Sequence, residues 1–202
     1  MNFTKQISTN EITPKTNTEK ERSNPLFSTK SLVTMALFAA VLCVSAYISV
    51  ALPNGMHVTF LNFVSTLIAL VFPWQQSFLI VLVWILMGSV GIPVFIGGNA
   101  GIGYLLSALG GYTLAFLAVS FFVPLLCGKK YNRIRYTIIA VLSVIFVDVA
   151  GMLQLMFLQG LTLKQAIIPG FLSFIVLDLI KAVVAAQIAP AFRNVIASIA
   201  EV

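Results

Sequence analysis

Charged side chains are scarce in this sequence. Asp, Glu, Lys and Arg make up 9% of its 202 residues, whereas hydrophobic residues make up 59%. Soluble domains carry about 25% charged residues, so a soluble fold could not cover this much apolar surface. From residue 31 to residue 128 there is no Asp, Glu, Lys or Arg at all. At about 20 residues per span, this stretch accommodates about four membrane helices.

A second long stretch, from Tyr136 to Phe192, contains only four charged residues and suits two more spans. The sequence therefore predicts an all-α integral membrane protein, a six-helix bundle formed by residues 31–202. We expect its helices at residues 31–50, 58–72, 77–90, 102–126, 136–158 and 167–190. Residues 1–30 are polar and include Pro14 and Pro25, and they hold too little apolar surface to fold alone. We interpret them as a flexible cytoplasmic tail.

Motifs for enzymatic chemistry are also absent. The two cysteines, Cys43 and Cys127, are too few for a disulfide framework or a zinc site, and His57 stands apart from other metal ligands. The chain has no nucleophile elbow, no zincin motif and no Walker sequence. We therefore expect no metal and no cofactor, and any ATP hydrolysis must come from another chain.

Basic residues flank the apolar spans, which argues for membrane topology and against a nucleic-acid surface. On six spans, one side receives ten of them: Lys5, Lys15, Lys20, Arg22, Lys30, Lys129, Lys130, Arg133, Arg135 and Arg193. The loops on the other side contain only Lys164. The positive-inside rule then places both termini in the cytoplasm.

A glycine-rich segment, GIPVFIGGNAGIG, runs from Gly91 to Gly103 between the third and fourth predicted helices. Irregular backbone at membrane depth is tolerated where it is buried in protein or lines a cavity. Gly97 and Gly98 would allow the backbone to approach a ligand, and Asn99 offers both a donor and an acceptor. The segment is either an ordinary surface loop or a lid over a ligand, and its apolar residues favour a lid.

Three ionisable residues lie inside predicted spans: Asp148, Asp178 and Lys181. Such residues are costly in a membrane and are functional candidates. Asp178 and Lys181 are three residues apart, so they share a helix face and form either a structural ion pair or a binding pair for a urea-type group. Asp148 has no partner nearby in sequence. Gln154 is either a further polar contact or an interhelical hydrogen bond.

Small residues recur every four positions in two predicted helices, where they allow close helix packing. One stripe comprises Gly103, Ser107, Gly111 and Ala115, and the other comprises Ala36 and Ala40. Spacing alone does not show whether these stripes meet this chain or a partner.

With these features in hand, the sequence resembles the BioY family, the biotin-capture (S) components of energy-coupling-factor (ECF) vitamin transporters. The resemblance covers residues 31–190 and is most specific in GIPVFIGGNAGIGYLLSALGGYTLAF from Gly91 to Phe116, with Asp178-Leu-Ile-Lys181 and the Ala36 to Ala40 stripe in support. It implies a multi-pass protein of the cell membrane that binds biotin from outside without catalysis. It also implies partners, namely a transmembrane EcfT-type coupling subunit and two cytoplasmic ATPases.

The resemblance also assigns residues. Asn99, Asp178 and Lys181 would bind the ureido ring, with further contacts expected from Gly98, Phe95, Tyr104, Tyr112 and Gln154. Ala36 and Ala40 would face the coupling subunit. The segment LPNGMHVTFLNF, from Leu52 to Phe63, departs from the family pattern in having fewer Pro and Gln residues, which argues against a ligand role for it.

Two other function classes remain open from the residues. One is a membrane enzyme that uses Asp148 and Asp178 as acid and base, although it would need a nucleophile or a metal constellation. The other is a self-sufficient, proton-coupled secondary transporter of a small polar metabolite, with Asp178 and Lys181 as the coupling pair. That transporter would favour inverted repeats, and none is evident.

Overall fold

The computed structural model describes residues 28–51, 57–128 and 130–201. The described residues are mostly helical and include one short hairpin. Its α-helices are α1 (Thr29–Ser45), α2 (Leu61–Val71), α3 (Trp74–Ser89), α4 (Ile102–Leu105), α5 (Gly110–Cys127), α6 (Arg133–Gln159), α7 (Leu163–Ile167) and α8 (Ser173–Glu201). The remaining elements are the strands β1 (Ser49–Ala51) and β2 (His57–Thr59), the 3-10 turn η2 (Ile96–Gly98) and the π-turn η3 (Ile168–Leu172).

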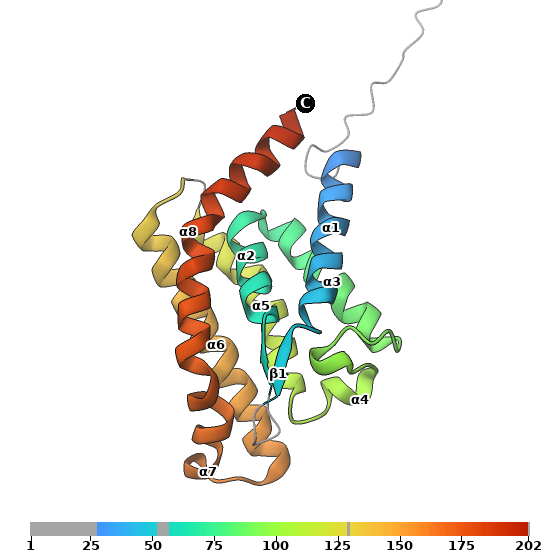
Figure 1. Cartoon of the computed structure of the whole chain (residues 1–202), viewed down its shortest axis with the longest axis vertical. Coiled ribbons are helices and arrows are strands. Elements are labelled where there is room, and N and C mark those ends of the chain that lie inside the picture. Colours follow the sequence, from blue (N-terminus) through green and yellow to red (C-terminus); the bar gives the residue numbers. More distant parts are fainter. Residues whose placement is uncertain (1–27, 52–56, 129, 202) are drawn as a thin grey trace, which may run out of the picture.

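The helices form an all-α membrane protein, as the sequence predicts. Among the described residues, α5, α6 and the helical stretch 163–198 are each long and apolar enough to cross a membrane, and α1, α2 and α3 are shorter apolar helices. α5 packs against α6, and α8 packs against both α6 and α2, while α3 covers the other side of α5. Figure 1 shows the hairpin, α4 and α7 at one end of the bundle and the C-terminus at the other. We call these the hairpin end and the terminal end.

The hairpin corrects the predicted boundaries of the first two helices. Helix α1 ends at Ser45, and the chain then forms β1, which pairs antiparallel with β2 and places Val50 opposite Val58. Prediction missed the strands because each is only three residues long and directly adjoins an apolar run. The turn signal Pro53–Gly55 lies outside the described residues.

The predicted helix 102–126 is also wrong as one continuous element. It is divided into α4 and α5, and the Ser107 hydroxyl in the connection donates to the Tyr104 carbonyl oxygen over 2.6 Å. A side-chain hydrogen bond of this kind competes with the helical backbone. Gly103 and Ser107 therefore lie outside the helix that carries Gly111 and Ala115, so the predicted stripe is interrupted. Gly111, on α5, packs closely on α6, because a Cβ atom at this position would meet Gln154 and Ala150.

Helix α8 extends well beyond the predicted end at residue 190. It contains Pro190 and continues to Glu201, so Arg193 lies within the helix and not after it. A proline usually kinks a helix without ending it. Here the inner face of α8 is held by four alanines that are completely buried: Ala182, Ala185, Ala186 and Ala189.

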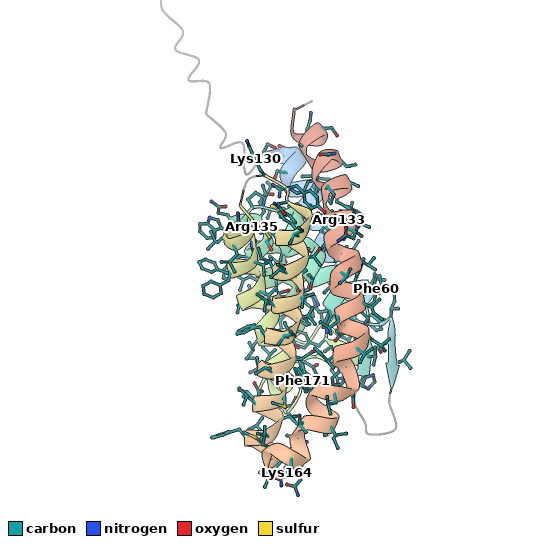
Figure 2. All side chains as sticks on the ribbon, turned by 90° about the vertical axis from the view of Figure 1, so that its left-hand side faces the viewer. Phe60, Lys130, Arg133, Arg135, Lys164 and Phe171 are labelled. Atoms are coloured by element: carbon teal, nitrogen blue, oxygen red, sulfur yellow. The ribbon has the colours of Figure 1, made fainter. Side chains whose placement is uncertain are left out.

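Basic residues cluster at the terminal end. Lys130, Arg133 and Arg135 lie there, whereas Lys164 lies at the hairpin end (Figure 2). This separation follows the predicted division of charge between the two sides of the membrane. Residues 1–27, most of the predicted tail, and Lys129 lie outside the described residues.

Candidate functional site

A cavity opens in the hairpin half of the bundle and is lined by residues of β2, α2, η2, α5, α6 and α8. Its volume is about 400 Å³, including the part that opens to solvent. The lining residues are His57, Thr59, Asn62, Ile96, Leu109, Tyr112, Asp148, Phe174 and Asp178. The wall thus combines apolar side chains with a few polar groups, which is typical of small-molecule sites.

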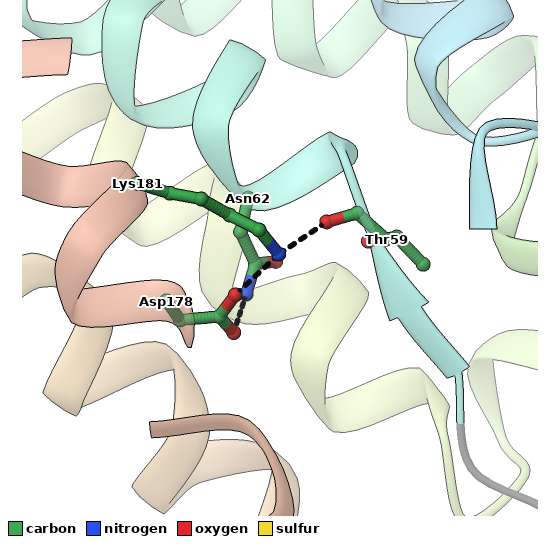
Figure 3. Close-up of polar contacts among 4 residues, drawn as sticks. All are labelled: Thr59, Asn62, Asp178 and Lys181. Atoms are coloured by element: carbon green, nitrogen blue, oxygen red, sulfur yellow. Dashed lines mark hydrogen bonds and ion pairs between the residues drawn. The ribbon is translucent and has the colours of Figure 1, made fainter. Parts of the chain in front are cut away.

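Asp178 is the centre of a polar network on one wall of the cavity (Figure 3). Its Oδ1 atom accepts from Lys181 Nζ over 2.7 Å, and its Oδ2 atom accepts from Asn62 Nδ2. Lys181 Nζ also donates to the Thr59 carbonyl oxygen over 2.8 Å. The Asp178 side chain is 3% exposed and that of Lys181 is 19% exposed, so the carboxylate is buried and the lysine side chain is mostly buried.

The network connects three elements. Asp178 and Lys181 share a face of α8 because they are three residues apart. Asn62 lies in the first turn of α2, and Thr59 is the last residue of β2. The ion pair therefore fastens the hairpin and α2 to α8, and it presents charged hydrogen-bonding groups beside the cavity.

Tyr112 and Asp148 also line the cavity. The Tyr112 hydroxyl donates to the Gly170 carbonyl oxygen over 2.6 Å. Its ring lies against Gly151 of α6, where no Cβ atom would fit beside it. Asp148 is 1% exposed, and neither of its carboxyl oxygens has a hydrogen-bond partner among the described residues.

The glycine-rich segment is an ordered part of this end of the protein. Trp84 Nε1 donates to the Val94 carbonyl oxygen over 2.9 Å, and the Tyr47 hydroxyl donates to that of Pro93. Gly97 has a φ of 69°, which suits glycine. Of this segment, Ile96 lines the cavity.

The predicted site residues are only partly brought together. Tyr112 and Asp178 line the cavity, with Lys181 bound to Asp178. Phe95 is completely buried and stacks on Tyr104 with ring centroids 4.9 Å apart, so this pair lies in the core behind the segment. Asn99 is exposed, and its side chain donates to the Ile96 carbonyl oxygen over 2.7 Å.

The Gln154 side chain forms two hydrogen bonds within the fold. Its Nε2 atom donates to the carbonyl oxygens of Leu105 and Ser107, over 3.0 and 2.6 Å. An interhelical hydrogen bond was one of the two alternatives that the sequence offered for Gln154. These bonds attach the connection between α4 and α5 to α6.

The sequence missed three cavity residues from the hairpin region: His57, Thr59 and Asn62. All three line the cavity, although the departure of this segment from the family pattern argues against a ligand role. The sequence held one signal that could have pointed to this region: Asn62 is an isolated amide within an apolar run. Within the described residues, no group of three or more His, Cys, Asp or Glu side chains could hold a metal ion.

Comparisons with known proteins agree with one another. The model of the BioY family matches residues 16–198 of this chain. Biotin transporter BioY2 of Lactococcus lactis subsp. cremoris is 34% identical over 155 residues, which cover 76% of this chain and 84% of that protein. The probable biotin transporter BioY of Pyrococcus horikoshii is 34% identical over 160 residues, which cover 79% and 94%.

Solved structures extend the likeness to the fold. The crystal structure of the S-component for biotin from an ECF-type ABC transporter has a TM-score of 0.75 and 25% identity, and the match covers 82% of this chain and 91% of that one. The crystal structure of FolT bound with folic acid has a TM-score of 0.61 at 16% identity, covering 82% and 98%, which shows a shared fold. By its sequence and its fold, the chain belongs to the BioY family.

Proposed function

We propose that this protein is the biotin-binding S component of an ECF-type ABC transporter in the cell membrane. The observation that carries the proposal is the cavity with its Asp178–Lys181 pair, found in a chain whose relatives are named as biotin transporters. A ureido ring has two N–H donors and one carbonyl acceptor. A wall that presents a carboxylate beside an ammonium group matches both kinds of group.

The ring of biotin would bind at the buried wall, and the valeryl carboxylate would face the opening. Tyr112 and Phe174 supply apolar surface for the ring and chain. Asn99 and Gly98 remain proposed contacts, since they follow closely after Ile96, whose side chain lines the cavity. Phe95 and Tyr104 would act from behind the segment by fixing its position.

The cavity would open to the outside of the cell. Lys130, Arg133 and Arg135 lie at the terminal end of the bundle (Figure 2), and basic residues favour the cytoplasmic side. Both termini would then be cytoplasmic, with residues 1–30 as a polar tail and residues 31–202 as the membrane domain. Biotin could be captured from outside before any energy is supplied.

Transport would require partners, a transmembrane EcfT-type coupling subunit and two cytoplasmic ATPases. Helix α1 offers a surface for them, because its outward face is exposed and apolar along its whole length. That face comprises Val33, Ala36, Leu37, Ala40, Val41 and Val44. Ala36 and Ala40 form a shallow strip on which a partner helix could pack closely.

Ala36→Trp and Ala40→Trp are expected to prevent assembly with the coupling module while biotin binding stays within about twofold of wild type. A bulky side chain would hold the partner helix away from the strip, whereas the cavity is not lined by α1. Co-purification with the tagged coupling module and calorimetric titration measure the two effects. Leu142→Trp, at an exposed position of α6, is the matched control, and its assembly should be normal. Normal assembly of both alanine variants would contradict a docking role for this strip.

The function itself is tested with purified protein in detergent and in liposomes. Biotin should bind the isolated chain, whereas accumulation in liposomes should require the coupling subunit, the ATPases and ATP. A chain that accumulates biotin alone under a proton gradient would be a secondary transporter. A well-folded, monodisperse chain that does not bind biotin would exclude the proposed substrate.

A further inference from the structure

Asp148 is the most unusual polar residue in the bundle. It lies within α6 at membrane depth and is 1% exposed, yet both carboxyl oxygens lack a hydrogen-bond partner among the described residues. Buried polar groups in proteins are nearly always hydrogen-bonded, and a charge buried without a partner is costly. A residue of this kind in a packed interior therefore needs an explanation outside the contacts of the fold itself.

The cavity supplies that explanation, because Asp148 is part of its lining. We infer that Asp148 binds the ligand directly, as an acceptor for an N–H group of the ureido ring. This inference rests on the proposed function and adds to it a recognition residue on α6, in the same cavity lining as Asp178.

The distribution of donors and acceptors in the cavity favours this role. Each oxygen of Asp178 already accepts from a protein donor, Oδ1 from Lys181 and Oδ2 from Asn62. The Thr59 carbonyl oxygen also accepts from Lys181. The oxygens of Asp148 are thus the carboxyl acceptors of the described lining that no protein group uses.

A ureido ring presents two N–H donors on either side of its carbonyl group. Because each carboxylate oxygen can accept a second hydrogen bond, Asp178 can take one N–H group beside its protein donors and Asp148 can take the other. Lys181, bound to Asp178, would donate to the carbonyl oxygen. The described lining, together with Lys181, has two carboxyl groups and one ammonium group. This excess of acid would also accommodate a cationic guanidinium ring in place of the ureido ring.

Titrations of biotin and 2-iminobiotin, in which a guanidinium group replaces the ureido group, test the inference. Asp148→Ala should raise the Kd for biotin roughly 10- to 100-fold, because a hydrogen bond to a charged group is lost. Asp148→Asn keeps one acceptor oxygen, so its Kd for biotin should stay within roughly tenfold of wild type. Both variants should lose most of the binding of 2-iminobiotin, since neither retains the negative charge.

Melting temperature separates recognition from support of the fold. Because Asp148 makes no protein hydrogen bond among the described residues, Asp148→Asn should melt at or above the wild-type temperature. Ser143→Ala is the control on the same helix, since this buried hydroxyl donates only to Ala140 of its own helix over 2.8 Å and does not line the cavity. Its Kd values should be those of wild type.

Two results would overturn the inference. One is an Asp148→Ala variant that binds biotin with wild-type affinity. The other is an Asp148→Asn variant that melts at a lower temperature than wild type and loses affinity for biotin and 2-iminobiotin equally. That result would mean that the Asp148 carboxyl group supports the fold and does not recognise the ligand. Failure of the wild-type chain to bind biotin would instead reject the proposed function, so the two failures are distinguishable.

Discussion

Lys181→Met is expected to raise the Kd for biotin at least about 30-fold. Lys181 donates to Asp178 and to the Thr59 carbonyl oxygen, so its loss removes a ligand-binding cation and leaves a buried carboxylate with Asn62 as its remaining partner. Truncating one member of a buried charged pair costs about 2 kcal/mol or more. Calorimetric titration of the purified variant measures the change.

The control must separate lost recognition from lost stability. The double variant Asp178→Asn/Lys181→Met removes both charges, and pairs replaced together are often tolerated by the fold. We expect it to melt closer to wild type than Lys181→Met does and still not to bind biotin. Lys164→Met, on α7 at the same end of the bundle, should bind normally. Wild-type affinity in a folded Lys181→Met protein would contradict the proposed role of the pair.

Gly88→Ala is expected to destabilise the protein by about 1–3 kcal/mol, the usual cost of overpacking. A Cβ atom on Gly88 would collide with the ring of Phe95. That ring cannot retreat, because it is completely buried between Trp84, 5.5 Å away, and Tyr104, 4.9 Å away between centroids. Melting in detergent, followed by size-exclusion chromatography, should show a decrease of roughly 2–12 °C.

Gly103→Ala is the matched control for this prediction. A Cβ atom at Gly103 would meet no other atom within 4 Å, so the same substitution there should leave the melting temperature almost unchanged. If Gly88→Ala also melts like wild type, the glycine-rich segment is not held as tightly as the packing around Phe95 indicates.

The sequence was sufficient for the features that depend on local patterns. Long apolar runs predicted the membrane helices, and the spacing of three residues predicted the ion pair of Asp178 and Lys181, which the structure confirms at 2.7 Å. Basic residues flanking the runs predicted the charge separation between the two ends. Each of these signals lies within one helix or one loop, where spacing in the sequence determines position in space.

Features that depend on distant contacts were not predictable in the same way. The division between α4 and α5 is held by Gln154, which binds Leu105 and Ser107 from another helix. Asn62 reaches Asp178 across 116 residues of sequence. The hairpin was not predicted because its strands are three residues long and adjoin apolar runs. Their pairing between α1 and α2 cannot be read from hydropathy.

Asp148 is an intermediate case. Its position inside a span marked it as a functional candidate, but no neighbour in the sequence indicated a role. Only the folded chain places it in the lining of the same cavity as Tyr112 and Asp178.

The bond from Lys181 to Thr59 joins residues 122 positions apart, and this has a consequence for biogenesis. Because β2 and α2 are synthesised early and α8 is made last, the pocket does not exist until the final helix has entered the membrane and packed on α2. Contacts of such long sequence separation form late in folding. Ligand binding therefore requires that insertion of α8 is complete. Biotin bound where β2 and α2 meet α8 would stabilise newly made chains against loss of α8 from the membrane.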